Sequence, residues 1–154
     1  RLENFWDPYH SKLAELLDRA RQQFGYSILI DTHSMPHEAI LNASSSFRTS
    51  QIVLGDRYGA TCAPEIINDL IKLISKNGLR ASRNIPFSGA YIVQKYGSPG
   101  LNRHAIQLEI DRSIYMDERK IQKLEKFHKL KNKLQNIMRD FSQIHTCLTS
   151  IAAE

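Results

Sequence analysis

A short apolar run that ends in a carboxylate and an imidazole constrains this chain more than any other feature. Residues 28–30 are Ile-Leu-Ile, which is typical of a strand covered on both faces. Asp31 ends the run and His33 follows two residues later, so both side chains should point to the same side of the strand. Pro36 has no N–H to donate and should end the pairing. The sequence therefore predicts a polar pair at the carboxyl end of an interior strand, where open α/β sheets bind ligands.

Two interpretations of this pair follow from the residues alone. A neutral imidazole is the commonest metal ligand in proteins, and a neighbouring carboxylate can orient it. On that interpretation His33 is a metal ligand and Asp31 lies behind it. A polar strand end without any ligand explains the same residues, and the stretch by itself leaves both open.

The length and composition fit one globular domain. The chain has 154 residues, of which 42% are hydrophobic and 24% charged, so it can bury a core. No apolar run is long enough to span a bilayer, and no charged-then-apolar segment opens the chain. Two cysteines, Cys62 and Cys147, are too few for a disulfide framework, so we expect a cytoplasmic protein with a structural thiol at Cys62. Because Arg1 is not a translational start, we also expect part of the natural protein to precede it.

The net charge of +5 is concentrated near the C-terminus. Residues 117–140 hold eight basic and four acidic side chains, a net charge of +4. A nucleic-acid contact is one explanation. Basic residues alternate there with apolar ones at helical spacing, however, so a solvated helix face explains the charge at least as well. We therefore expect this helix to pack against the domain or a partner rather than to bind nucleic acid.

The order of predicted elements indicates an α/β fold with a mainly parallel sheet flanked by helices. Apolar periodicity predicts helices over residues 8–24 and 64–77, and a long C-terminal helix from residue 116 onward. Apolar runs predict strands over 26–31, 51–54 and 105–111, and turn-forming residues predict loops over 37–50 and 84–100. His10 falls in the first turn of the first helix, where we expect a surface or partly buried residue.

Polar side chains also follow the other two predicted strands. Asp56 and Arg57 lie between two glycines, which suggests a tight turn that projects a charged side chain. An arginine fork matches a carboxylate or phosphate, although a surface turn with an incidental ion pair is equally consistent. Glu109 shares a strand face with other polar residues, and covering that face would require a partner or cation for it. We expect these clusters and the Asp31/His33 pair to converge on one edge of the sheet.

Several motifs together resemble the N-formylglutamate amidohydrolase family. They are Pro8-Tyr9-His10, Asp31-Thr-His33-Ser34-Met-Pro36, Leu54-Gly55-Asp56-Arg57-Tyr58-Gly59, Asn84-Ile-Pro86-Phe87-x-Gly89-Ala-Tyr91-Ile92, Tyr96-Gly97-x-Pro99 and Gln107-Leu-Glu109-Ile-Asp111-Arg112 with Tyr115-Met116-Asp117-Glu118 after it. The resemblance implies a domain over residues 1–118, followed by a helical extension over 119–154.

The resemblance implies a fold similar to zinc-dependent exopeptidases, of the phosphorylase/hydrolase-like class, and a zinc-dependent hydrolase of N-formyl-L-glutamate that serves histidine degradation. His33 would be a zinc ligand oriented by Asp31, and Glu109 the general base and acid. Arg57, Asn84, Tyr91 and Arg112 would bind the N-acyl amino acid. The family's other metal ligands belong to an N-terminal half that has no counterpart here, so we expect this chain alone to be incomplete and to associate through an exposed sheet edge or its long C-terminal helix. A catalytically inactive binding or structural module is the alternative.

Overall fold

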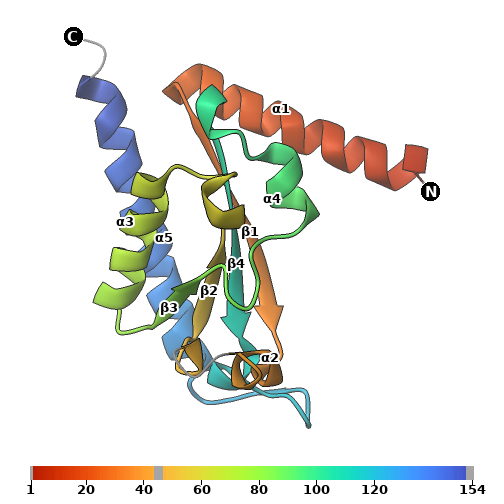
Figure 1. The fold of residues 1–154 in the computed structure, drawn as a ribbon, viewed down its shortest axis with the longest axis vertical. Coiled ribbons are helices and arrows are strands. Elements are labelled where there is room, and N and C mark those ends of the chain that lie inside the picture. The colour runs from red at the N-terminus through yellow and green to blue at the C-terminus, as the bar shows by residue number, and fades with distance from the viewer. Residues whose placement is uncertain (1, 44–46, 152–154) are drawn as a thin grey trace.

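A computed structural model describes residues 2–43 and 47–151, with side chains described up to residue 144. Its helices are η1 (Leu2–Trp6), α1 (Asp7–Phe24), α2 (His37–Leu41), η3 (Arg57–Gly59), α3 (Pro64–Lys76), α4 (Tyr91–Tyr96), η4 (Pro99–Leu101), η5 (Arg112–Ile114) and α5 (Phe127–Ile151). Its strands are β1 (Ser27–Met35), β2 (Ile52–Gly55), β3 (Ala81–Arg83), β4 (Arg103–Asp111), β5 (Met116–Asp117) and β6 (Gln122–Lys123). Figure 1 shows the sheet in the middle, with α3 and α5 side by side on one flank and α4 on the other. The predicted α/β fold is confirmed.

Four strands form the main sheet in the order β1-β4-β2-β3. The β1–β4 and β2–β3 pairings are parallel, whereas β2 and β4 run antiparallel. The sheet is therefore mainly parallel, as predicted, but its two halves run in opposite directions. The prediction that all three polar clusters converge on one edge is wrong for Asp56 and Arg57. Because β2 ends opposite Gln107, these two residues lie beside the middle of β4 rather than at its carboxyl end.

One face of the sheet is the main apolar core. Alternate residues of β2 and β4 point into it, and the apolar face of α3 covers them. The long helix α5 completes the layer by adding Leu130, Ile137 and Phe141 to the same core. Burial of this kind supplies most of the stabilisation of a domain, at about 25 cal/mol per Å² of apolar surface. The predicted packing role of the C-terminal helix is thus what its contacts show.

The opposite face of the sheet carries the polar residues. Because partners in a register share a face, the pairings place His33 beside Glu109, and Asp31 beside Gln107. A small apolar cluster of Met35, Ile40 and Val53 closes one end of this face. Helix α4 contacts β4 and β1, and its N-terminus bonds to Gln107. The sheet thus has an apolar face that forms the core and a polar face whose buried residues the core does not explain.

Two local predictions are corrected. The C-terminal helix begins at Phe127 rather than near residue 116, because residues 116–123 form the β5–β6 hairpin. The Asp117 carboxylate accepts the backbone N–H groups of Arg119 and Lys120, which favours a turn over a helix. The predicted loop over 37–50 contains helix α2, and its residues 44–46 lie outside the described part. Within the described residues, none of the helices is long and apolar enough to cross a membrane.

Candidate active site

The predicted pairing of Asp31 and His33 is confirmed, but the strand that carries them is at the edge of the sheet and not in its interior as predicted. Both side chains lie on the same face of β1, with Nε2 of His33 3.0 Å from Oδ2 of Asp31. The two atoms are close without forming an aligned hydrogen bond, so this carboxylate oxygen is buried without a hydrogen-bond partner. His33 is 44% exposed and Asp31 only 17%. The carboxylate is therefore the recessed member of the pair and the imidazole the accessible one.

Glu109 is the second carboxylate of this face. It is 7% exposed and sits directly opposite His33 in the register between β1 and β4. Its Oε1 accepts a hydrogen bond of 2.7 Å from Nε2 of Gln107, whereas its Oε2 is buried without a partner. A buried carboxylate oxygen without a hydrogen bond is unfavourable by about 1–3 kcal/mol or more. Such an atom in a native protein calls for a specific explanation, such as a catalytic role or a bound water molecule or ion.

Asp56 and Asn84 are tied to each other. Asp56 is fully buried and accepts hydrogen bonds from Nε of Arg83 at 3.1 Å and Nδ2 of Asn84 at 2.7 Å. The carbonyl oxygen of the Asn84 side chain in turn accepts the backbone N–H of Asp56 at 3.0 Å. Asn84 was predicted to bind substrate, and its amide is here engaged at both ends. That role stays a prediction.

Arg57 extends from the loop that Asp56 anchors. Its backbone and that of Tyr58 are both left-handed, with φ of 50° and 57°. This conformation is uncommon for residues with a side chain and is found disproportionately at functional sites. The guanidinium donates from Nη1 to the backbone oxygen of Gly89 at 3.2 Å, and the backbone N–H of Arg57 donates to Ser88 at 2.7 Å. The loop at residues 88–90 therefore fixes the direction of the arginine.

The other two predicted substrate residues are Arg112 and Tyr91. Their contacts are with residues other than Glu109. Arg112 donates to the hydroxyl and backbone oxygen of Ser34 at 3.2 and 3.1 Å. Ser34 alternates with His33 along β1, so its side chain is on the other face of the strand. Tyr91 is exposed at the start of α4, where its ring is 5.4 Å from that of Trp6. The structure brings Asp31, His33 and Glu109 together and does not place these two beside them.

A second carboxylate–imidazole contact was not predicted. Nδ1 of His37 lies 2.9 Å from Oδ2 of Asp111, and Oγ of Ser113 lies 3.2 Å from the same nitrogen. The signal was present in the sequence, because Asp111 is two residues beyond Glu109 and so shares its face. The sequence did not show that the end of β1, and with it α2, would lie beside Asp111. That position depends on the parallel pairing of β1 with β4.

His10 belongs to an aromatic cluster between α1 and α4 rather than to the surface. Its Nδ1 is 2.6 Å from the hydroxyl of Tyr96, and its ring lies 4.0 Å from that of Trp6. Burial, the largest cause, and the Lys95 ammonium lower the pKa of His10, while Asp7 opposes them. A histidine kept neutral in this way joins the two helices and carries little positive charge near neutral pH.

A catalytic zinc ion normally has three protein ligands and a water molecule. Among the described residues there is no group of three histidine, cysteine, aspartate or glutamate side chains that could hold a metal ion. His33, Asp31 and Glu109 have suitable chemistry, but the described side chains do not come together as such a group. The part of the chain that the structure describes therefore does not fit a catalytic zinc by itself.

The chain matches known proteins over its first three quarters. The family model for N-formylglutamate amidohydrolase matches residues 1–116. The N-formylglutamate deformylase of Pseudomonas putida is 37% identical over 122 residues, and that of Pseudomonas aeruginosa is 35% identical over the same length. The crystal structure of N-formylglutamate amidohydrolase from Ralstonia eutropha JMP134 superposes with a TM-score of 0.82 at 32% identity and covers 93% of this chain.

These matches cover only part of the relatives. The two aligned regions include 76% of this chain but 43% and 44% of the deformylases, and 52% of the Ralstonia protein is covered. The chain thus spans less than half the length of the curated relatives it matches. Its motifs, its fold and its sequence agree nonetheless, and the chain belongs to the N-formylglutamate amidohydrolase family.

Proposed function

We propose that residues 1–118 are part of a hydrolase that cleaves the amide bond of N-formyl-L-glutamate to formate and L-glutamate. The observation that carries this proposal is the buried, unpaired Oε2 of Glu109 beside His33 on the polar face of the sheet. An acceptor without a partner in a recessed position suits a group that takes a proton during a reaction. The names of the relatives supply the amide substrate and support the assignment.

In the proposed reaction Glu109 acts first as a base and then as an acid. Its free oxygen removes a proton from a water molecule while the water oxygen forms a bond to the formyl carbon. The carbon–nitrogen bond then breaks as Glu109 passes the same proton to the amine nitrogen of glutamate. The formic acid that is released gives its remaining proton to that amine and leaves as formate. A positioned base and acid of this kind contributes about 10² to 10⁴ in rate.

We propose that Arg57 binds a carboxylate of the substrate. Its planar fork can hold a carboxylate through two parallel hydrogen bonds, and the loop at 88–90 fixes its direction. Arg57→Lys should weaken N-formyl-L-glutamate binding by about tenfold, because an ammonium cannot present that fork. Asn84, Tyr91 and Arg112 remain candidates for contacts with the rest of the substrate.

We also propose zinc as the cofactor, with His33 as one ligand and Asp31 orienting its ring, in a fold similar to zinc-dependent exopeptidases. The other ligands would come from the part of the domain that the relatives have beyond the matched region. Purified residues 1–154 should accordingly bind less than one zinc per chain and release formate no faster than background. Stoichiometric zinc with turnover well above background would show that these residues hold a complete site.

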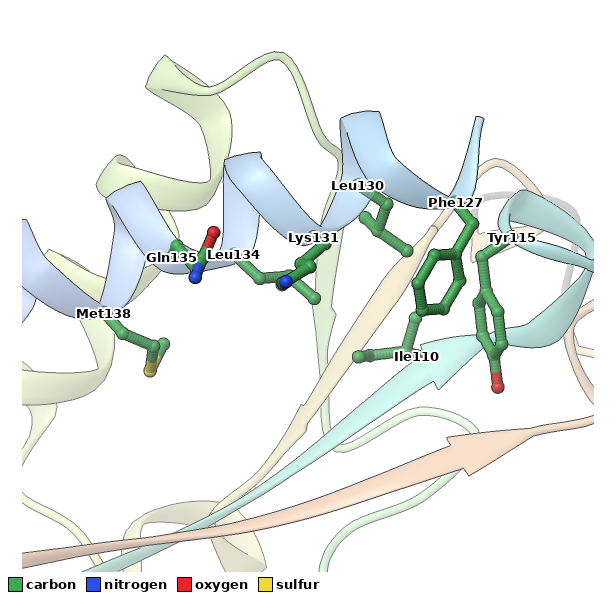
Figure 2. Close-up of a pocket in the computed structure, with 8 residues that line it drawn as sticks. All are labelled: Ile110, Tyr115, Phe127, Leu130, Lys131, Leu134, Gln135 and Met138. Atoms are coloured by element: carbon green, nitrogen blue, oxygen red, sulfur yellow. The ribbon is translucent and has the colours of Figure 1, made fainter. Parts of the chain in front are cut away.

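Two surfaces could receive the rest of such a domain, the free edge of β1 and an apolar groove under α5. Among the described strands β1 lies at the edge of the sheet, so it offers unpaired backbone groups on one side. The groove of about 620 Å³ is lined mainly by apolar side chains, including Ile110 of β4 and Phe127 and Met138 of α5. Figure 2 shows the α5 side chains pointing toward the strands. We expect the isolated chain to bind a hydrophobic dye through this groove and to lose that binding when Met138 is replaced by lysine.

An NMR titration of the ¹⁵N-labelled chain tests the assignment without needing turnover. N-formyl-L-glutamate should shift the backbone amides of residues 88–90 and the side chain of Arg57. N-formylglycinamide, which lacks both carboxylates, is the matched control and should shift them far less. Equal responses to the two ligands, or none to either at millimolar concentration, would contradict the proposed substrate.

A further inference from the structure

Gln107 has a side chain that is hydrogen-bonded both to Glu109 and to the segment before α4. It is 4% exposed and lies on β4 two residues before Glu109, so the two side chains share a face. In the register it stands between Asp31 of β1 and Gly55 of β2. A buried amide in the middle of a sheet requires partners for its donor and acceptor atoms.

The hydrogen bonds of Gln107 determine which way its amide faces. Its Oε1 accepts the backbone N–H of Ala90 at 2.7 Å, and its Nε2 donates to Oε1 of Glu109 at 2.7 Å. A backbone N–H can only donate, so the oxygen of the amide must face Ala90 and the NH₂ group must face Glu109. The glutamine therefore occupies one oxygen of the carboxylate and leaves the other, Oε2, without a partner.

The segment at the other end of Gln107 is the loop that fixes Arg57. Residues 88 and 89 accept the backbone N–H and the guanidinium of Arg57. The loop also lies directly on β2, because a Cβ added to Gly55 would be 2.5 Å from the backbone nitrogen of Gly89. Only glycine permits so close an approach of the two backbones. A displacement of the loop would therefore reach both Arg57 and Gln107.

We propose that Gln107 is a positioning residue, which holds Glu109 with Oε2 as its proton-accepting atom and joins that carboxylate to the loop at residues 88–90, which fixes the direction of Arg57. The inference rests on the proposed function, since it assigns a direction to the base in that reaction. In this arrangement Gln107 and the loop at residues 88–90 support both the base and the substrate-binding arginine. The distance between Glu109 and Arg57 is then set by the hydrogen bonds of these elements rather than by two independent side chains. Preorganisation of this kind matters because small misplacements of catalytic groups lower rates strongly.

NMR of the side-chain amide of Gln107 tests the arrangement in the 154-residue chain. Its Nε2 resonance should change as Glu109 takes up a proton, because the hydrogen bond to a carboxylate is stronger than that to a carboxylic acid. In Glu109→Gln this pH response should disappear, while the backbone amide of Ala90 should stay in place. The side chain of Gln23, which is exposed on α1, is the internal control and should respond to neither change.

Two substitutions separate the two ends of the glutamine. Gln107→Glu keeps an acceptor for Ala90 but removes the donor to Glu109, whereas Gln107→Met keeps the size of the side chain and removes both bonds. The Ala90 amide should shift in Gln107→Met and much less in Gln107→Glu. Where turnover is measurable, both variants should lower kcat about tenfold or more with little change in KM, while Gln23→Met changes neither.

The proposal would be overturned if the side-chain Nε2 resonance of Gln107 changed neither with pH nor in Glu109→Gln, even if the chain binds N-formyl-L-glutamate. Loss of folding in Gln107→Met would not affect this result, because the amide signature is read in the unsubstituted chain and in Glu109→Gln. A failure of the proposed function would appear separately, as the absence of ligand-induced shifts at Arg57. The two ideas can thus fail independently.

Discussion

Asp56, which directly follows β2, and Glu109, on the neighbouring strand β4, are both buried carboxylates, but their surroundings differ. Both oxygens of Asp56 are occupied, because Arg83 approaches each of them and Asn84 adds a further hydrogen bond. Glu109 has one oxygen bonded and the other unpaired. The first carboxylate is therefore neutralised and fully satisfied, whereas the second retains an unused acceptor. The difference separates a carboxylate that holds the fold from one that is available for chemistry.

The largest expected effect concerns the thiol beside Asp56. Burial, and secondarily the Asp56 carboxylate, raise the pKa of Cys62 to about 12. With Cys147 replaced by serine, the remaining thiol should react with Ellman's reagent at pH 8 at least about a thousandfold more slowly than a cysteine peptide. The reaction should become fast in urea. Rapid labelling of the native protein would mean that water reaches the Asp56 cluster.

Removing the Asp56 charge should have the next largest effect. Asp56→Asn leaves the Arg83 guanidinium without its anion, and we expect the free energy of unfolding to fall by roughly 3 kcal/mol. The value lies at the low end of the usual range because the Arg83 side chain is 31% exposed. Asp69→Asn, which breaks the surface pair with Lys72, is the control and should change stability by less than about 1 kcal/mol. Similar losses in the two variants, measured by urea unfolding, would remove the contrast.

Glu109→Gln should alter stability far less than Asp56→Asn. The substitution removes an unpaired buried charge and keeps an oxygen for Gln107, so we expect a change within about 1 kcal/mol in either direction. Where hydrolysis can be measured, the same variant should lose at least about a hundredfold in kcat, and Glu125→Gln, at an exposed site, should not. A loss of more than about 2 kcal/mol would assign Glu109 to the same structural role as Asp56.

The smallest expected effect is the pH dependence that His10 contributes. Its pKa is lower in the folded than in the unfolded chain, so the unfolded state takes up more protons as the pH falls. The stabilisation from neutral His10 is complete above about pH 6.5, the ordinary histidine value, and is lost as the pH falls through the folded-state pKa. Urea unfolding between pH 8 and 5 should show a decline that is shallower in His10→Gln. Parallel curves for the two proteins would contradict this.

Local patterns in the sequence predicted much of this arrangement. The two-residue spacing of Asp31 and His33 was enough to place them on one face, because strand alternation is a local rule. The polar face of β4 followed from the same rule applied to Glu109. Strand direction is not local, however, and the antiparallel contact of β2 with β4 moved Asp56 and Arg57 away from the predicted edge.

Predictions about individual partners were weaker for the same reason. The resemblance implied a substrate contact for Asn84, and the sequence did not show that its amide also bonds to Asp56, 28 residues away. The hairpin at 116–123 interrupts what resembled a continuous helix, since the Asp117 turn outweighs a helical pattern of apolar residues. Long-range contacts decide such cases, and a single sequence does not display them.

The left-handed backbone at Arg57 and Tyr58 has a consequence for how the chain can diverge. Tyr58 is 75% exposed and its ring is free to vary, yet its φ of 57° favours glycine or asparagine. A change to glycine would relax the turn and favour stability, but it would also release the segment that aims the arginine. Backbone stability and a fixed direction of Arg57 therefore make opposite demands on the residue at position 58.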